Sequence, residues 1–432
     1  MSIISVQYNH MNILAIETSC DESSIAILSV EGSLPSPTFT VRAHNTASQI
    51  EMHKQYGGVF PSVAKREHAK ALTPLLEATL GDAGMLDKIS SNISDEKYGP
   101  ITELLHREPE IVADLRKFTD NHTLYNIDYL CVTTGPGLAP SLWVGVNFAK
   151  ALSILFDIPV MPVNHMKGHI WSVFATDEEF TLPEIQFPML ALLISGGHTE
   201  LDLVHSYSSY EKIGQTRDDA VGEAFDKVGR MLGLPYPAGP IIDKLASSSL
   251  DTGEVPEGRR GIKNNPNTPQ SRSSLSRQIP YIEEHRIQLP RPMLHSDDLD
   301  FSFSGLKTAV RNLIADLEKT NSKVLTNIRM KSDIASEFQN AVTDVLIHKT
   351  RKAIEEHSPS SIIISGGVSA NSQIRKSCSE LADEYNIDCH IPPLSLTGDN
   401  ALMIGIAGAI SILENKKCTD VDEIVANGNL AP

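Results

Sequence analysis

Two histidines spaced four residues apart are the side chains whose spacing most directly suggests chemistry. His165 and His169 stand in the segment Asn164–His169, and on a helix this spacing places both imidazoles on one face, where they can bind one cation. Fifteen histidines in 432 residues also produce such pairs by chance, so both interpretations stay open at this point. Asp399, in the turn Leu396–Asn400, is the candidate third ligand, and a turn-capping role is its alternative.

Met166 argues against one interpretation of the histidine pair. Zinc proteases with the pattern His-Glu-x-x-His use the glutamate as their base. Met166 stands in that place here, so a metalloprotease is disfavoured.

Glycine-rich turns that follow apolar runs suggest phosphate binding. Residues 190–194 lead into Ser195–Gly197, and residues 362–364 lead into Ser365–Gly367. Such turns present backbone N–H groups to an anion, and glycine lets the anion come close. For a third turn, Thr134–Leu138, anion binding and a plain strand-to-helix connection are equally supported. Together the turns predict a nucleotide cleft.

A carboxylate among small residues could form one wall of such a cleft. Residues 218–227 combine an apolar helical stripe with a second face, on which Gly222, Asp226 and Gly229 lie. Small residues would let a ligand approach the helix, and the carboxylate could accept hydrogen bonds from ribose hydroxyls. The alternative is a solvated helix face, which this segment taken alone favours.

Strands alternate with helices in both halves of the sequence, which predicts the α/β class. Residues 13–28 have the pattern of a strand, a polar turn and a second strand; residues 189–204 repeat it, and residues 362–367 begin a third related unit. The apolar spacing of residues 334–345 predicts a helix that Ser332 caps.

The expected organisation is two lobes with additions. We expect an N-terminal extension over residues 1–11, an N-terminal lobe over 12–187, a C-terminal lobe over 188–414 and a tail over 415–432. Residues 82–126 and 251–292 are polar and weakly patterned. Both are expected to be insertions, the second partly disordered.

The bulk properties exclude several classes of protein. The formal net charge of −17 argues against a generic nucleic-acid-binding protein, although a local basic patch can bind RNA on an acidic body. Five scattered cysteines without a Cys-x-x-Cys pair indicate a reducing compartment. No apolar run approaches the ~18–20 residues that span a bilayer, so no membrane association is expected. Residues 1–11 are not Arg-rich and leave targeting undecided.

The order of the motifs is typical of one family. In sequence order they are Glu17–Glu22, Thr134–Leu138, Asn164–His169, Ser195–Thr199, Gly222–Lys227, Phe301–Thr308, Ser365–Asn371 and Thr397–Asn400. On these motifs the chain resembles the tRNA N6-adenosine threonylcarbamoyltransferases, once described as O-sialoglycoprotein endopeptidases. The resemblance covers Ile13 to about Leu413 apart from the two insertions.

The resemblance implies a two-lobed fold of the actin, Hsp70 and sugar-kinase type, with the ligand cleft between the lobes. It implies transfer of a threonylcarbamoyl group from threonylcarbamoyl-AMP, made by a separate synthase, to N6 of the adenosine beside the anticodon in tRNAs that read codons starting with A. It implies one divalent cation, iron, zinc or magnesium, with His165, His169 and Asp399 as its ligands. The residues implied for donor binding are Leu193, Ile194, Ser195, Gly196, Gly197, Asp226, Gly239, Asp243 and Asn371.

The resemblance assigns further roles and shows one departure. Asp21 and Glu22 match acidic positions near the reacting centre, and Glu22 is the first candidate for the proton acceptor. Ala238 stands where relatives usually carry glycine, and we expect its Cβ to lie near the donor. Residues 301–308 and 365–371 are similar to the bacterial and mitochondrial branch. The low-complexity insertions favour a eukaryote, so we expect mitochondria and a homodimer, with a bacterial cytoplasm as the alternative.

Basic residues near the second insertion are candidates for contacts with tRNA phosphates, and a solvated loop is equally supported. They are Arg259, Arg260, Lys263, Arg272, Arg277, Arg286 and Arg291. Two further alternatives stay open: an ATP-using kinase or ATPase of the same fold, which the histidine pair does not favour, and an inactive nucleotide-binding scaffold.

Overall fold

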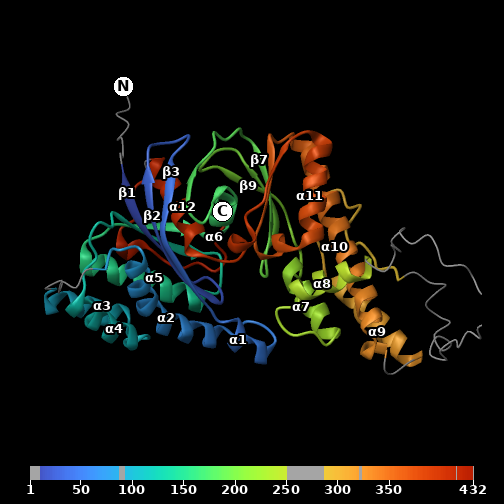
Figure 1. Cartoon of the computed structure of the whole chain (residues 1–432), viewed down its shortest axis with the longest axis horizontal. Coiled ribbons are helices and arrows are strands. Elements are labelled where there is room, and N and C mark those ends of the chain that lie inside the picture. Colours follow the sequence, from blue (N-terminus) through green and yellow to red (C-terminus); the bar gives the residue numbers. More distant parts are fainter. Residues whose placement is uncertain (1–9, 87–92, 251–286, 321–323, 415, 432) are drawn as a thin grey trace, which may run out of the picture.

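Two lobes lie side by side along the long axis of the molecule (Figure 1). The computed structural model describes residues 10–86, 93–250, 287–320, 324–414 and 416–431. Residues 1–9 of the expected extension and 251–286 of the second expected insertion lie outside this described part.

The N-terminal lobe is built on a six-stranded sheet with the order β5-β4-β1-β2-β3-β6. Its strands are β1 (Met11–Glu17), β2 (Glu22–Glu31), β3 (Thr38–Ser48), β4 (Tyr129–Gly135), β5 (Val160–Asn164) and β6 (Glu179–Thr181). β1, β2 and β3 are antiparallel neighbours, whereas β4 pairs in parallel with both β1 and β5. The predicted strand, turn and strand at the start of the chain are therefore confirmed.

The C-terminal lobe repeats this arrangement in a five-stranded sheet with the order β11-β10-β7-β8-β9. Its strands are β7 (Met189–Ile194), β8 (Thr199–Val204), β9 (Tyr210–Gln215), β10 (Ser361–Ser365) and β11 (Asp388–His390). β7, β8 and β9 are antiparallel neighbours, and β10 pairs in parallel with both β7 and β11. Because β1 and β7 hold equivalent places in the two sheets, the duplicated strand order confirms the predicted α/β class and the two-lobed fold.

Helices cover both faces of the N-terminal sheet (Figure 1). The helices of this part of the chain are α1 (Ile50–His53), α2 (Pro61–Asp82), α3 (Tyr98–Leu104), α4 (Pro109–Asn121), α5 (Ala139–Phe156) and α6 (His165–Trp171). Side chains of β1 alternate between the faces, as the period of a strand requires. Leu14 and Ile16 join the core formed with α2 and α5, and Ile13 and Ala15 join the core on the opposite face.

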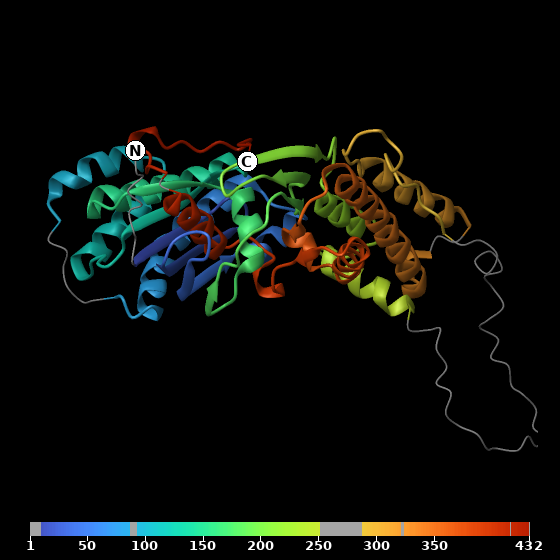
Figure 2. The same ribbon diagram turned by 90° about the horizontal axis from the view of Figure 1, so that it is seen from above.

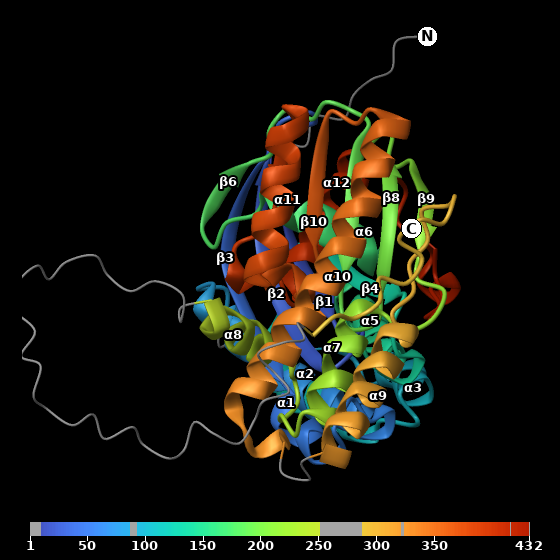
Figure 3. The ribbon, with the colours of Figure 1, turned by 90° about the vertical axis from the view of Figure 1, so that its right-hand side faces the viewer.

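The remaining helices cover the C-terminal sheet and close the molecule. They are α7 (Val221–Met231), α8 (Gly239–Leu250), α9 (Ser304–Thr320), α10 (Ile328–His357), α11 (Ser372–Tyr385) and α12 (Ala401–Leu413). Seen from the C-terminal lobe, α10 and α11 lie side by side in front of the sheet (Figure 3), where α11 packs against β10 and α10 against β7. The opposite face of β7, with Met189, Ala191 and Leu193, joins the same apolar core as Ile13 and Ala15. This shared core fixes the two lobes against each other.

Helix α12 departs from the expected lobe boundary at residue 414. It packs against α6 and against β1, β2 and β5 of the N-terminal lobe, and Figure 2 shows its red ribbon among the blue strands. An apolar helix that is buried along nearly its whole length needs neighbours on several sides, which this sheet face supplies. Residues 416–431 also return to the N-terminal lobe, because Asn427 N donates to Thr134 O at 2.8 Å and Gly137 N donates to Gly428 O at 3.2 Å.

Two local expectations were wrong. Helix α10 begins at Ile328 with Asn327 as its N-cap, whose Oδ1 accepts a hydrogen bond from Arg329 N at 2.9 Å. Ser332 lies inside the helix and donates to Leu245 O. The helix starts one turn earlier than expected because asparagine is as good a cap as serine.

The second wrong expectation was that no apolar segment approaches the length of a membrane span. Helix α5 is long and apolar enough, by length and composition, to cross a membrane. It packs against α2 and β4, which is the place of a core helix.

Candidate metal centre and inter-lobe cleft

The two histidines lie at the beginning of helix α6, directly after strand β5. Asn164 caps this helix, since its Oδ1 accepts hydrogen bonds from Met166 N at 2.8 Å and Lys167 N at 3.3 Å. Both imidazoles are buried, and their ring centroids lie 4.7 Å apart with the rings nearly perpendicular. The predicted helix and the shared helix face are therefore confirmed.

Asp399 is brought to the histidines by helix α12. Asn400 caps α12 by accepting a hydrogen bond from Met403 N at 3.0 Å. Helices α6 and α12 approach closely at Gly168, where a Cβ would lie 3.0 Å from the Met403 side chain. The position directly before the cap thus places the Asp399 carboxylate beside both rings.

The three side chains have the separation expected of ligands to one ion. Asp399 Oδ1 lies 3.4 Å from His165 Nε2 and 3.3 Å from His169 Nε2. Two ligands ~2.1 Å from one ion in tetrahedral geometry are about 3.4 Å apart. Atoms of all three side chains lie within 4.8 Å of one another. Neither ring nitrogen of His169 has a hydrogen-bond partner in the described part of the chain, although the residue is 1% exposed, and a cation would satisfy Nε2.

Glu17 holds His165 from behind, a role that the sequence did not reveal. Its Oε2 lies 3.1 Å from His165 Nδ1 and accepts a hydrogen bond from Thr133 Oγ1 at 2.5 Å. Its Oε1 accepts one from Ser19 N, and Ser19 Oγ lies 3.3 Å from the same ring nitrogen. A carboxylate behind a histidine ligand fixes the ring orientation and leaves Nε2 free for the cation. The only signal in the sequence was the place of Glu17 at the end of the first strand.

Charges in this cluster are strongly coupled. Burial alone would lower the pKa of His165, but the carboxylates of Asp399 and Glu17 raise it to about 10. Burial raises the pKa of Asp399, but His165 and His169 outweigh it and hold that pKa well below its usual value. Because a metal ligand must be a neutral imidazole, a cation and a proton compete for His165.

A cavity of about 720 Å³ opens in front of these side chains, between the two lobes. It is lined from the N-terminal lobe by Ser19, Cys20, Asp21, Glu22, Gly57, Gly58, Val59, Pro136, Gly137, Leu138 and His165. From the rest of the chain it is lined by Ser195, Gly196, Gly197, His198, Glu223, Asp226, Lys227, Arg230, Tyr236, Gly367, Gly398, Asp399 and Gly428. The cavity thus unites most of the motifs singled out in the sequence.

The turn Ser195–Gly197 is an open element of this cavity. Ser195 N donates to His198 O at 2.8 Å, and Ser195 Oγ accepts from His198 N at 3.1 Å, which closes the turn. A Cβ at Gly196 or Gly197 would meet no atom within 4 Å, so the turn borders free space on that side, which an anion can enter. His198, which the sequence analysis did not single out, lines the cavity. Burial, together with His165 and His169, lowers the pKa of His198 to about 4, so its imidazole is neutral.

The small residues of helix α7 have a different role from the expected one. A Cβ at Gly222 would lie 2.6 Å from Ser195 O, and one at Gly229 would lie 2.1 Å from Ala238 Cβ. They therefore let the turn and Ala238, rather than a ligand, approach the helix. Ala238 is 1% exposed and joins the core of the C-terminal lobe, so its side chain is not part of the cavity lining in the described chain, and its expected nearness to the donor stays a prediction.

Asp226 lines the cavity from the same helix. Its Oδ1 accepts a hydrogen bond from Ala238 N at 2.8 Å. Burial raises the pKa of Asp226 above its usual value. One carboxylate oxygen thus fixes the following loop, and the other is available to a hydroxyl group of a ligand.

Other residues expected to bind the donor lie behind the cavity wall. Leu193 and Ile194 are fully buried strand residues. Asp243 accepts hydrogen bonds from Ser372 N at 3.1 Å and Ser372 Oγ at 2.8 Å. Asn371 caps α11 by accepting from Ile374 N at 3.0 Å and donates to Gln339 Oε1 at 2.8 Å. These residues and Gly239 are absent from the cavity lining in the described chain; direct donor contacts stay a prediction for all five.

Asp21 and Glu22 lie together on the N-terminal side of the cavity. Burial and the neighbouring carboxylates of Asp21 and Asp399 raise the pKa of Glu22 to about 10. Burial also raises the pKa of Asp21. Because two adjacent carboxyl groups in a poorly solvated site tend to share one proton, Glu22 holds it at neutral pH, and the expected role of Glu22 as proton acceptor does not fit this charge state.

The turn Thr134–Leu138 has its N–H groups occupied. Gly137 N donates to Gly428 O at 3.2 Å, and Leu138 N donates to Ser19 O at 2.8 Å. Of the two readings given by the sequence, a strand-to-helix connection fits better than an anion-binding turn. The turn nevertheless forms the rim of the cavity through Pro136 and Gly137.

The basic residues of the second insertion are largely beyond the described ranges. Only Arg291 of that group lies within them. Its guanidinium pairs with Glu337 at 2.6 Å and with Asp344 at 2.8 Å. Arg291 therefore anchors its segment to helix α10.

Comparison with known proteins agrees with this geometry. A model of the tRNA N6-adenosine threonylcarbamoyltransferase family matches residues 40–90 and 112–406. A protein of that name from Chromobacterium violaceum is 37% identical over 402 residues, which cover 93% of this chain and 93% of the relative. One from Halalkalibacterium halodurans is 38% identical over 398 residues, covering 92% and 90%.

Solved structures give a weaker match. Full-length HypF in its phosphate- and nucleotide-bound form has a TM-score of 0.48 and 12% identity, over 94% of this chain and 47% of that chain, a similarity too low to support a conclusion. The family match over most of the chain and the near-complete coverage of the relatives are decisive. This chain belongs to the tRNA N6-adenosine threonylcarbamoyltransferase family.

Proposed function

We propose that this chain modifies tRNA by transferring a threonylcarbamoyl group from threonylcarbamoyl-AMP to N6 of the adenosine beside the anticodon, in tRNAs that read codons starting with A. The observation that carries the proposal is the convergence of His165, His169 and Asp399 at the wall of the inter-lobe cavity, opposite the open turn Ser195–Gly197. The family assignment supplies the type of reaction.

A divalent cation held by His165, His169 and Asp399 would supply Lewis-acid stabilisation of oxygen atoms on the donor. Two imidazoles and one carboxylate are ligands that suit zinc or ferrous iron, whereas magnesium prefers an all-oxygen set. We therefore propose zinc or iron rather than magnesium as the resident ion.

The protein's own groups would position the donor. The Cα positions of Gly196 and Gly197 border free space, and backbone N–H groups of this turn would bind phosphate oxygens of the donor. Asp226, with one oxygen free of the bond to Ala238 N, would accept a hydrogen bond from a ribose hydroxyl. Because an exocyclic amine is a weak nucleophile, such positioning would supply much of the rate acceleration.

The leaving proton of the adenosine amine needs an acceptor. The high pKa of Glu22 leaves it protonated, so we propose Asp21, the other carboxyl group of the pair, as the acceptor. Asp21 lines the cavity beside Glu22. The proton on Glu22 would then stabilise the Asp21 carboxylate by a hydrogen bond.

Transfer to tRNA is the direct test. Purified chain, threonylcarbamoyl-AMP and an unmodified tRNA are incubated, and the nucleosides are analysed by mass. We expect His165→Ala and His165→Gln to lower transfer at least about 100-fold, with a folded protein by circular dichroism. The matched control is His205→Ala, a histidine exposed near the β8–β9 turn, which should retain full activity.

Three results would overturn the proposal. Full transfer by both His165 variants would remove the cation from the reaction. Absence of modified adenosine with the unaltered chain would favour an inactive scaffold. Phosphorylation of a small molecule from ATP, without transfer, would favour a kinase of the same fold.

Assembly and location are separate proposals. We propose a homodimer in mitochondria, which rests on the likeness of residues 301–308 and 365–371 to the bacterial and mitochondrial branch. Light scattering of the purified chain tests the first, and microscopy of a tagged full chain in the source cell tests the second. A monomer, or a purely cytosolic signal, would contradict them.

A further inference from the structure

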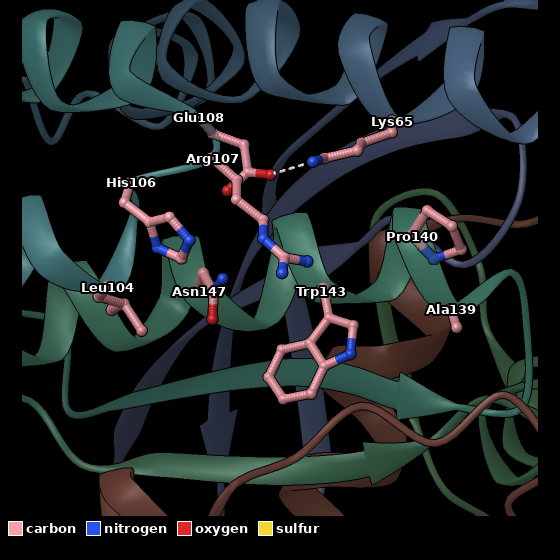
Figure 4. Close-up of a pocket in the computed structure, with 9 residues that line it drawn as sticks. All are labelled: Lys65, Leu104, His106, Arg107, Glu108, Ala139, Pro140, Trp143 and Asn147. Atoms are coloured by element: carbon pink, nitrogen blue, oxygen red, sulfur yellow. Dashed lines mark ion pairs between the residues drawn. The ribbon is translucent and has the colours of Figure 1, made fainter.

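A second cavity lies on the N-terminal lobe, outside the inter-lobe cleft (Figure 4). Its volume is about 350 Å³, within the ~300–1,000 Å³ usual for small-ligand sites. The residues that line it, here called the α5 pocket, are Lys65, Leu104, His106, Arg107, Glu108, Ala139, Pro140, Trp143 and Asn147. Helix α2, the end of α3 with its connection to α4, and the first turns of α5 contribute them.

The pocket offers an aromatic surface to solvent. Trp143 is 38% exposed, whereas the chain's other tryptophan, Trp171, is 1% exposed in the core. An exposed indole in a concave site is a platform on which a planar base can stack. Ala139, Pro140 and Leu104 provide the apolar surroundings.

Cationic side chains surround the indole. Arg107 is exposed and forms no ion pair with a carboxylate in the described ranges, and Figure 4 shows it extending toward the face of α5 that carries Trp143 and Asn147. Lys65 pairs with Glu108 at 2.6 Å, and His106 lines the same pocket. Glu108 offsets the charge of Lys65, so the guanidinium of Arg107 is the positive charge that favours an anionic ligand on a chain with a net charge of −17.

Asn147 adds an unused hydrogen-bonding group. Its Oδ1 is buried and has no partner among the residues that the structure describes. Buried amide oxygens are nearly always paired in folded proteins. An N–H group of a base that enters the pocket could donate a hydrogen bond to this oxygen.

The α5 pocket begins where the inter-lobe cleft ends. Gly137 and Leu138 line the cleft, and the next two residues, Ala139 and Pro140, line the pocket. Trp143 follows one helical turn later, about 6 Å along the axis of α5 from Ala139. A strand of nucleic acid with one nucleotide in the cleft would therefore have this pocket within reach of a neighbouring nucleotide.

Part of the pocket lies outside the segments that the family model matches. The family model matches residues 40–90 and 112–406, so Leu104, His106, Arg107 and Glu108 fall in the unmatched segment between. That segment belongs to the stretch expected as an insertion, and its helices α3 and α4 place these residues over α5. The insertion thus builds one wall of a cavity on a helix that the family shares.

We propose that the α5 pocket binds an unpaired nucleotide of the tRNA substrate, with the base stacked on Trp143 and the phosphate bound by Arg107 and Lys65. The inference rests on the proposed tRNA-modifying function and extends it to a second contact with the anticodon loop, where bases are unpaired and open to stacking. An acidic peptide shares the charge of this ligand but lacks a planar base, so the exposed indole favours RNA.

Binding is tested on the full chain with a labelled anticodon stem-loop RNA. Trp143→Ala should weaken binding about tenfold, because stacking on an aromatic ring contributes that much per base, and Trp143→Phe should restore most of the loss. Arg107→Ala should reduce the slope of log affinity against log salt by about 1. Lys376→Ala, a lysine whose side chain is 77% exposed on α11, removes the same charge elsewhere and should leave affinity unchanged.

Tryptophan fluorescence reports the contact directly. Stem-loop RNA should quench the emission of the unaltered chain, and Trp143→Phe should abolish the quenching because Trp171 is buried. Equal quenching by poly-glutamate would overturn the proposal in favour of a peptide site. Unchanged RNA affinity in Trp143→Ala and Arg107→Ala would overturn it as well.

The outcome is separable from that of the proposed function. Loss of RNA affinity in the pocket variants, in a chain that transfers no threonylcarbamoyl group, would support the pocket while the proposed reaction fails. Full transfer with an unaltered KM for tRNA in both variants would reject the pocket while the reaction stands.

Discussion

His165 depends on a second carboxylate, Glu17, that lies behind it in the core. Glu17 is fully buried, and its two oxygens contact the ring and the groups that support it, which are His165 Nδ1, Thr133 Oγ1 and Ser19 N. Burial raises the pKa of Glu17, but His165 outweighs it and the net pKa lies below the usual value. The carboxylate is thus ionised and can orient the imidazole toward Asp399.

Glu17→Gln should lower the affinity for the divalent cation by roughly 10–100-fold, which is typical for the loss of a partner behind a metal-ligating histidine. The amide keeps the shape of the side chain but removes its charge. Isothermal titration with zinc measures the change. Glu31→Gln, at the exposed end of β2, is the control, and equal affinities of the two variants would contradict the role of Glu17.

The sequence revealed side chains whose type is unusual, and it missed those whose role depends on contacts. The histidine spacing and the turn at Asp399 suggested ligands without deciding between metal binding and chance, and the family resemblance implied the set that the structure brings together. Glu17 and His198 act through neighbours distant in sequence, which no spacing rule shows. The burial of Ala238 could not be predicted from the sequence, because it depends on the packing of Gly229 against it.

Strand β8 carries a buried carboxylate that should make stability depend on pH. Asp202 is fully buried, and neither of its oxygens has a hydrogen-bond partner in the described chain. Burial and the neighbouring Glu200 raise the pKa of Asp202 to about 8. Folding therefore takes up a proton between the unfolded pKa of about 3.9 and about 8, and stability falls as the pH rises through this window.

Asp202→Asn should remove this loss, because asparagine has a similar shape and no charge. Its stabilisation should grow from pH 5 to pH 8, by at most about 1.4 kcal/mol per pH unit. Urea unfolding at several pH values measures it. Glu211→Gln on β9, whose side chain is 61% exposed, should show no such trend, and a pH-independent effect of Asp202→Asn would refute the assignment.

The contact between helix α7 and the turn Ser195–Gly197 leads to a second prediction at the level of secondary-structure elements. Gly222→Ala would place a Cβ 2.6 Å from Ser195 O, so the turn must move away from the helix. We expect transfer to fall by at least about tenfold, because a shift of about 1 Å in a positioning element can cost ~100-fold. Gly99→Ala on α3, where a Cβ meets no atom within 4 Å, should keep its activity; equal activities would count against the turn.

The sequence predicted the helices and strands more readily than it predicted where they begin and which elements they pack against. Apolar strands and the α7 stripe were legible because period and burial agree. The start of α10 could not be predicted, since both Asn327 and Ser332 are adequate caps. The packing of α12 on the N-terminal lobe could not be predicted either, since a wholly apolar helix does not reveal which sheet will bury it.

At the scale of the whole molecule, the two lobes meet at the mouth of the cleft as well as in the shared core. Arg230 on α7 donates a hydrogen bond to Gly57 O in the N-terminal lobe, and both residues line the cavity. Arg230→Ala should speed amide hydrogen exchange around residues 54–60, because the lobes lose a contact that closes this side. Arg66→Ala, at an exposed position on α2, is the control. Unchanged hydrogen exchange in Arg230→Ala would show that the shared apolar core alone holds the two lobes together at this side of the cleft.

The return of the chain to its first lobe has a consequence for the order of synthesis. Asn427 and Gly428 bond to the turn that precedes α5, and Gly428 borders the cavity. Both are translated after every strand and helix of the two sheets. A nascent chain interrupted upstream of Asn427 would therefore hold both sheets on the ribosome while the rim of its cleft is still unfinished.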